Sequence, residues 1–273
     1  MIMLFMKIKK LLRAKHLEFI SAKSYTYIRK DGIFMDTIKI NKSNTLLVAH
    51  RGLSGIEQEN TNAAFIAAGN RSYFGIETDV HVTLDGKFVT IHDDSTKRVA
   101  IDDLTIEEST FDTLRALTLL SKDGIKNRND MKIPTLSEYI STCKRYKKTA
   151  VLELKNEFTQ EDISKICNEI NELDYLENVI FISFCFENLV RIRNIYPSQT
   201  VQFLTDKYSS ELVEKLVEHN FDLDILYTQL NKENIELLHS KNIKVNCWTC
   251  DDKEYAEQLC SYGIDFITSN ILE

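Results

Sequence analysis

The stretch Gly75–Val80 reads Gly-Ile-Glu-Thr-Asp-Val, a run of strand length that carries two carboxylates at alternate positions. Successive side chains of a strand point to opposite faces, so Glu77 and Asp79 project to the same side. The run before it, Leu46–His50, is apolar until it ends in a histidine. Short apolar runs of this kind are typical of strands buried in a parallel sheet. We therefore expect ionisable groups at the C-terminal ends of buried parallel strands.

Runs of the same kind recur along the chain, separated by stretches with the apolar spacing of helices, such as Ile163, Ile166 and Ile170. The alternation predicts an α/β fold, a TIM-like (β/α)8 barrel. Eight strands close such a barrel, so one candidate is not a barrel strand, and 223–227 is the weakest of them. The nine candidates are 46–50, 75–80, 88–92, 150–154, 179–184, 201–204, 223–227, 243–248 and 265–268.

Three segments depart from the regular alternation. The link 81–87 is too short for a helical crossover, so we expect it to return in extended form to the opposite end of the barrel, with a turn at Asp85-Gly86. Residues 93–131 are polar and read as an insertion after the third strand, where barrel enzymes carry loops that shape the substrate site. Residues 1–44 lack strand patterning. The predicted organisation is an N-terminal extension (1–44) and a barrel (45–273).

The composition excludes several classes of protein. With 43% hydrophobic and 27% charged residues the chain is globular rather than disordered, and a net charge of −7 argues against a nucleic-acid-binding surface. The six cysteines, with no secretory leader before them, predict reduced thiols and a cytoplasmic protein. Cys247 and Cys250 have CxxC spacing, but no second such pair accompanies them, so we favour a structural role over a redox or zinc site.

The N-terminus is apolar over 1–6 and basic over 7–15, which is the reverse of a signal peptide and too short for a membrane span. We favour a helix packed on the barrel. The alternative is an interfacial helix that contacts a membrane surface.

Ionisable residues gather at the strand ends, which meet at one mouth in a parallel barrel. Three carboxylates in apolar runs would be costly to bury without a partner, and a bound cation offsets that cost. An oxygen-rich ligand set suits Mg2+ or Ca2+ better than zinc. The strand-end residues are His50, Arg51, Glu77, Asp79, His92, Glu153 and Lys155.

Taken together, these motifs resemble the ordered set of the glycerophosphodiester phosphodiesterases, over about residues 46 to 270. No single element is specific, but their order and spacing are. The elements are His50-Arg51-Gly52, Glu59-Asn60-Thr61, Glu77-Thr78-Asp79-Val80, Thr83-x-Asp85-Gly86, His92-Asp93, Ile133-Pro134-Thr135-Leu136-x-Glu138, Glu153-Leu154-Lys155, Ser183-Phe184 and Trp248-Thr249.

The resemblance implies the TIM barrel of the phosphatidylinositol phospholipase C-like group and metal-dependent hydrolysis of a small glycerophosphodiester. Its metal ligands would be Glu77, Asp79 and Glu153, and its acid-base pair His50 and His92. Arg51 and Lys155 would contact the phosphate. From their positions we add Trp248 and Glu59 as candidate substrate contacts, and for Trp248 a role in the core is the alternative. The assignment of acid and base stays open, as does the attacking group, water or the glycerol 2-hydroxyl.

The chain departs from the family pattern at two positions within the motifs. Gln58 stands where proline is usual, and Asn270 replaces a closing carboxylate. We attribute Asn60 and Thr61 to the cap of a helix that begins near Ala63, and we treat His81 as a surface or structural residue. Two alternatives to the predicted reaction are a phospholipase D-like activity on lysolipids or sphingolipids and a barrel that binds phosphodiesters without cleaving them.

Overall fold

A computed structural model describes residues 26–29, 32–126 and 128–273, and the chain divides into two compact units, Met1–Asp36 and Thr37–Glu273. In the first unit, β1 (Thr26–Arg29) pairs with β2 (Gly32–Met35) in antiparallel fashion. This short sheet corrects our expectation of an extension without strands; its signal is the run of β-branched and aromatic residues on either side of Asp31-Gly32. The predicted N-terminal helix lies outside the described residues.

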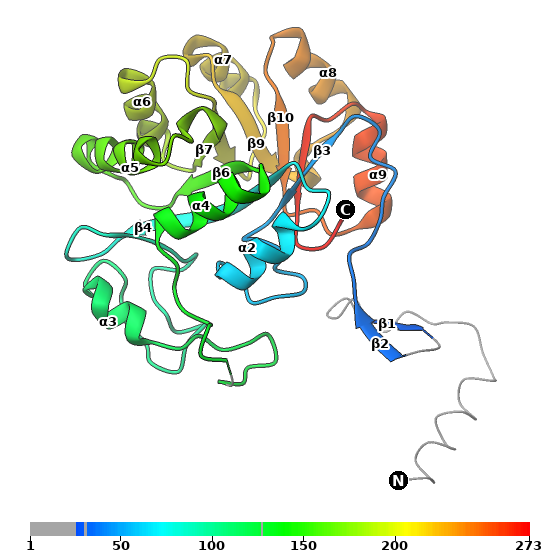
Figure 1. The fold of residues 1–273 in the computed structure, drawn as a ribbon. Coiled ribbons are helices and arrows are strands. Elements are labelled where there is room, and N and C mark those ends of the chain that lie inside the picture. Colours follow the sequence, from blue (N-terminus) through cyan, green and yellow to red (C-terminus); the bar gives the residue numbers. More distant parts are fainter. Residues whose placement is uncertain (1–25, 30–31, 127) are drawn as a thin grey trace. The chain divides into compact units, whose positions relative to one another are not determined.

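The second unit is a closed barrel of eight parallel strands (Figure 1), as predicted. Pairing of β3 with both β4 and β11 closes the sheet. The weakest strand candidate, 223–227, is in fact a barrel strand, because β9 pairs in parallel with β8 and with β10. The strands are β3 (Leu46–Ala49), β4 (Gly75–Val82), β6 (Thr149–Leu154), β7 (Val179–Ser183), β8 (Val201–Thr205), β9 (Asp222–Leu226), β10 (Val245–Trp248) and β11 (Phe266–Ser269).

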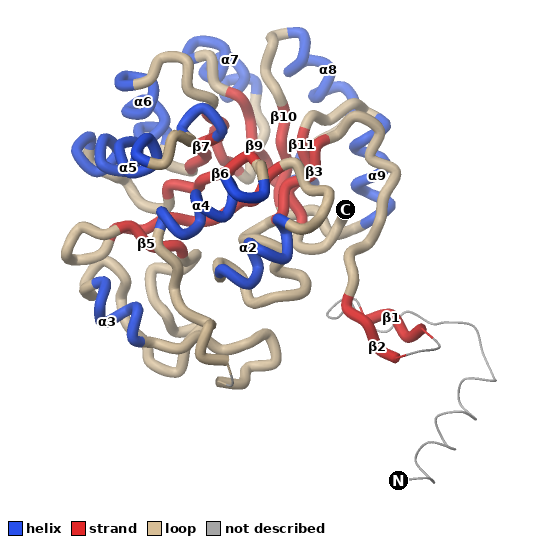
Figure 2. The backbone as a smooth tube through the Cα atoms, in the orientation of Figure 1, coloured by secondary structure: helices blue, strands red, loops and turns tan. Residues whose placement is uncertain are grey.

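Helices surround the strands of this unit (Figure 2). Each packs an apolar stripe inward; in α5 the stripe consists of Ile163, Ile166, Cys167 and Ile170, at the spacing the sequence predicts. The helices are α2 (Asn62–Gly69), α4 (Leu136–Tyr146), α5 (Gln160–Glu172), α6 (Phe186–Ile195), α7 (Ser210–His219), α8 (Lys232–Ser240) and α9 (Lys253–Ser261), with 3-10 turns at Leu176–Asn178 and Tyr227–Gln229.

The extra strand is β5 (Phe88–Thr90), which runs antiparallel to β4. The segment 81–87 therefore folds as part of a hairpin and does not return to the opposite end of the barrel. Our expectation was wrong because β4 extends to Val82, beyond the part of it that pairs with β3, and leaves an edge on which β5 can pair. The hairpin carries the chain back toward the barrel, where the Ile91 amide donates to the Asp79 carbonyl at 3.1 Å.

The insertion 93–131 includes the short helix α3 (Phe111–Ala116), and its Val99, Ile106 and Leu114 pack in one hydrophobic cluster with Val89 of β5. It is joined to the β3–α2 loop by cationic side chains. Arg128 donates to Glu57 at 2.8 Å, and the Lys122 ammonium donates to the Ser54 carbonyl. The insertion is thus a packed lobe anchored beside the loop that carries the first motif.

No helix in the described part of the chain has both the length and the apolar character that a bilayer crossing requires.

Candidate active site

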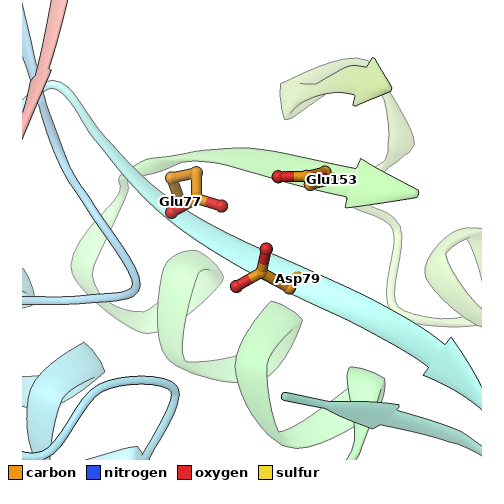
Figure 3. Close-up of side chains that lie close together, drawn as sticks. All are labelled: Glu77, Asp79 and Glu153. Atoms are coloured by element: carbon orange, nitrogen blue, oxygen red, sulfur yellow. The ribbon is translucent and has the colours of Figure 1, made fainter. Parts of the chain in front are cut away.

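Three carboxylates converge at the barrel mouth. Glu77 and Asp79 lie on β4, and Glu153 lies on the neighbouring strand β6, with Asp79 opposite Glu153 in the sheet register. One oxygen from each lies within 4.8 Å of the others, and all three residues are buried (Figure 3). The alternation of side chains along the strands, seen in the sequence, is what places them together.

These carboxylates cannot all ionise easily beside one another. Burial, with repulsion from Asp79 and Glu153, raises the pKa of Glu77, and burial with the Asp79 charge raises the pKa of Glu153 to about 7. Burial also opposes ionisation of Asp79, but Arg51 and Lys155 more than offset it and hold the Asp79 pKa below its usual range. Asp79 is therefore the most stable anion of the three.

The arrangement fits a divalent cation. Oδ1 of Asp79 is buried and accepts no hydrogen bond, which leaves a lone pair free for a ligand. Carboxylate oxygens are the donors that Mg2+ and Ca2+ prefer, and a positive ion at this point would relieve the repulsion among the three groups. Glu77, Asp79 and Glu153 are the residues that would hold it.

Two cationic side chains border the carboxylates. Arg51 follows β3 in the left-handed region (φ 52°), and its backbone amide donates to Glu77 at 2.7 Å. The next residue, Gly52, has φ 74°, and a Cβ there would lie 2.7 Å from Ala64, so the turn requires glycine. Lys155 directly follows β6; its Nζ lies 2.8 Å from Glu153 Oε1 and 3.6 Å from Asp79 Oδ1.

His50 lies at the end of β3 and has a neutral partner. Its Nδ1 lies 2.8 Å from Oδ1 of Asn270, whose Nδ2 donates to Asp251 at 2.6 Å. Because the amide nitrogen faces the Asp251 carboxylate, the amide oxygen faces the imidazole, and Nδ1 must carry the hydrogen. Burial, followed by the Arg51 charge, lowers the pKa of His50 to about 4. The ring is neutral at pH 7, with an unprotonated Nε2.

His92 has a charged partner. Its Nδ1 lies 2.6 Å from Oδ1 of Asp93, and that carboxylate also contacts Arg98. Burial lowers the pKa of His92, while Asp79 and Asp93 oppose that shift. The Asp79 charge also acts to raise the pKa of His50, so the same carboxylate influences both imidazoles. The hairpin brings His92 close enough to Asp79 for the charge of that carboxylate to act on the imidazole, although β5 is not a barrel strand.

Asn60 was missed as a site residue. Thr61 is the N-cap of α2, as expected, but the buried side chain of Asn60 is not part of the cap. It donates to Asp79 Oδ2 at 2.7 Å and accepts from Thr78 at 2.6 Å. These bonds fix the rotamer of Asp79. The available signal was the position of Asn60 next to Glu59 in a motif already singled out.

The model of the glycerophosphoryl diester phosphodiesterase family matches residues 50–272. The chain belongs to this family.

Individual members are similar over most of their length. A glycerophosphodiester phosphodiesterase of Caldanaerobacter subterraneus subsp. tengcongensis is 30% identical, covering 83% of this chain and 94% of the relative. A solved glycerophosphodiester phosphodiesterase of Parabacteroides distasonis is 26% identical, with a TM-score of 0.70, covering 84% of this chain and 94% of that one. The fold also matches an Oleispira antarctica phosphodiesterase solved with the product sn-glycerol-3-phosphate (24% identity, TM-score 0.73, coverage 85% and 96%).

The remaining candidate residues of this family member have mixed surroundings. Glu59 is paired with Arg51 at 2.9 Å and with Arg98 at 2.7 Å. Trp248 packs against the apolar interior of the barrel and meets the ring of Phe184 edge-on, with centroids 5.5 Å apart. His81 is fully buried, with its Nε2 3.4 Å from the His92 carbonyl, so the structural alternative holds and the surface alternative is wrong.

The CxxC pair has no reactive character. Cys247 and Cys250 are buried free thiols, and burial raises the pKa of Cys250 to about 12. A thiolate at either position is disfavoured at neutral pH.

Proposed function

We propose that this chain is a metal-dependent glycerophosphodiester phosphodiesterase that releases glycerol 3-phosphate and an alcohol. The observation that carries the proposal is the convergence of three buried carboxylates with two histidines and two cations at one barrel mouth. Family membership supports the same reaction class, and relatives named for this activity cover most of the chain.

One divalent cation, Mg2+ or Ca2+, would bind Glu77, Asp79 and Glu153 and would supply positive charge to a phosphate oxygen. Arg51 and Lys155 already contact these carboxylates, so their positive groups border the space that a phosphodiester would enter. Both side chains would bind the non-bridging oxygens and stabilise the charge that develops on them during displacement.

The unlike partners of the histidines support an assignment of roles. His50 faces a neutral amide and has a low pKa, so its Nε2 is unprotonated and can accept a proton as a general base. His92 faces the Asp93 carboxylate, which favours the imidazolium form and suits a general acid that donates to the leaving alkoxide. We propose His50 as the base and His92 as the acid, with water or the glycerol 2-hydroxyl as the group that His50 deprotonates.

Trp248 and Glu59 are proposed to contribute to substrate binding in different ways. The exposed edge of the Trp248–Phe184 pair offers an apolar surface at the mouth, against which the glycerol or the head group can pack. Glu59 is already paired with two arginines, which favours a contribution through Arg51 over direct contact.

The deciding experiment is a metal titration with glycerophosphocholine as substrate. EDTA should abolish release of glycerol 3-phosphate, and added Mg2+ or Ca2+ should restore it. Full activity after exhaustive chelation would contradict the metal assignment, and binding without turnover in the presence of metal would favour a non-catalytic barrel.

A lysolipid is the second candidate substrate. The observation that favours it is Phe184, a large apolar side chain that is 48% exposed at the end of β7. Assays of a lysophospholipid and of glycerophosphocholine side by side would distinguish the two candidate substrates.

A further inference from the structure

Arg98, in the insertion, joins two carboxylates at the edge of the site. Its Nη1 and Nη2 donate to the two oxygens of Glu59 at 2.7 and 2.8 Å. Its Nε and Nη2 donate to the two oxygens of Asp93 at 2.7 and 3.1 Å. A planar guanidinium can serve two carboxylates in this way because its donors form a rigid fork.

Each of these carboxylates holds another side chain of the site. Asp93 accepts from Nδ1 of His92 at 2.6 Å, and Glu59 accepts from Nη1 of Arg51 at 2.9 Å. Arg51 in turn reaches Asp79, with Nε 3.6 Å from Oδ2. Arg98 is therefore the midpoint of a continuous chain of polar contacts that runs from His92 to Arg51.

We propose that Arg98 is a positioning residue that orients both His92 and Arg51 through Asp93 and Glu59. The inference rests on the proposed function, because it assigns Arg98 to the acid and to the phosphate contact of that reaction. His92 acts on the leaving group and Arg51 on the phosphate, so one side chain outside the barrel orients the contact to each of them.

A role in folding alone does not account for the arrangement. The Arg98 side chain is 45% exposed, and ion pairs this exposed contribute little to the free energy of unfolding. The insertion is also anchored to the β3–α2 loop by Arg128, through Glu57 at 2.8 Å. Arg128 thus provides a matched control: an arginine that joins the same lobe to the same loop but reaches neither His92 nor Arg51.

The test compares steady-state kinetics of Arg98→Ala, Arg98→Lys and Arg128→Ala with the unmodified protein. We expect Arg98→Ala to lower kcat/KM by about tenfold to a hundredfold, the size of effect that a small misplacement of reacting groups produces. Both kcat and KM should change. Arg98→Lys should recover only part of the loss, because a single ammonium cannot satisfy both carboxylates. The kcat/KM of Arg128→Ala should stay within about twofold of that of the unmodified protein. The melting temperatures of all these variants should be similar.

Two further variants test whether Arg98 acts through Asp93 and Glu59. Asp93→Asn should mainly lower kcat, and Glu59→Gln should mainly raise KM. If Arg98 acts through these carboxylates, adding Arg98→Ala to either variant should cost much less than the product of the separate losses. Guanidinium ion added to Arg98→Ala should restore part of the activity.

The inference is overturned if Arg98→Ala behaves like Arg128→Ala, if Arg98→Lys is fully active, or if the double variants lose activity multiplicatively. Failure of the proposed function has a different signature, since the unmodified protein would then release no glycerol 3-phosphate from glycerophosphocholine in the presence of metal.

Discussion

The two histidines of the site are held by different chemistry drawn from different parts of the chain. His50 follows the first barrel strand, and its partner Asn270 follows the last, 220 residues away. His92 comes from the β4–β5 hairpin, and its partner is the next residue, Asp93. One partner is a neutral amide oriented by Asp251, and the other is a carboxylate paired with Arg98.

This difference suggests how one mouth can provide both a base and an acid. The hydrogen bond to the Asn270 amide favours the protonated form of His50, but an imidazole beside a carboxylate gains more stabilisation when it is protonated, because the carboxylate is charged. Closure of the barrel brings the neutral partner, Asn270, to His50. The added hairpin carries His92 together with its charged partner, Asp93. The Asp79 charge acts on both imidazoles.

The largest expected effect comes from removing either ring. His50→Ala and His92→Ala should each lower the rate by about 10² or more, because each removes a proton-transfer group. The pH profile of the unmodified protein should be bell-shaped, with His50 responsible for the acidic limb and His92 for the alkaline limb. Circular dichroism controls for folding. Either variant with near-normal activity would exclude that histidine from the mechanism.

Substituting the hydrogen-bond partners of the two histidines should shift the limbs of the pH profile. Asn270→Asp adds a carboxylate beside His50, which raises its pKa, so the acidic limb should shift to higher pH by about one unit or more. Asp93→Asn removes the carboxylate beside His92, which lowers its pKa, so the alkaline limb should shift to lower pH. Profiles of kcat/KM measure both. Movement of the opposite limb in each variant would reverse the assignment of acid and base.

The carboxylates of β4 and β6 should make metal binding depend on pH. The pKa of Glu77 is raised and that of Glu153 is about 7, so without a cation these groups stabilise the fold most below their unfolded pKa of about 4.5. That stabilisation is lost as the pH rises through 7 and the protons leave. Added Mg2+ or Ca2+ should therefore raise the melting temperature by more degrees at about pH 8 than at about pH 5.5. Equal shifts of the melting temperature at both pH values would contradict a competition between protons and the cation for these carboxylates.

The smallest expected effect concerns the alcohol. If His92 is the acid, the leaving group lies on the side of Asp93 and Arg98, both of which are partly exposed, and no aromatic cage for a quaternary ammonium could be identified from the sequence. Diesters of choline, ethanolamine and glycerol should then differ by less than about tenfold in kcat/KM, or about 1.4 kcal/mol. Release of glycerol 3-phosphate from each measures this. A strong preference for a lysophospholipid control would transfer the proposal to the lipid substrate.

The barrel and its carboxylates were predictable because they follow from strand periodicity. Alternation put Glu77 and Asp79 on one face, and the parallel sheet put Glu153 beside them. Hairpin geometry was not recognised, because the choice between an extended return and an antiparallel pair depends on how far β4 extends beyond β3, and apolar pattern does not encode that length.

Hydrogen-bond partners that are far apart in the sequence could also not be predicted from it. Asn270 could be recognised as a departure from the family pattern, but its contact with His50 depends on barrel closure. The link from Arg98 to Glu59 joins residues from two loops, and spacing along the chain gives no measure of that distance. Asn60 was attributed to a helix cap because its neighbour Thr61 accounts for the local pattern.

The pairing of His50 with Asn270 also sets an order of assembly. As the chain leaves the ribosome, β4, β5 and β6 can already bring Glu77, Asp79, Glu153 and His92 together through contacts between neighbouring segments. His50 acquires its hydrogen-bond partner only when β11, at the far end of the chain, docks against β3. Contacts of such long sequence separation carry a large loop-closure entropy and form late. We therefore expect newly made or partly unfolded chains to be inactive until the final strand docks, so that turnover reports the last step of folding.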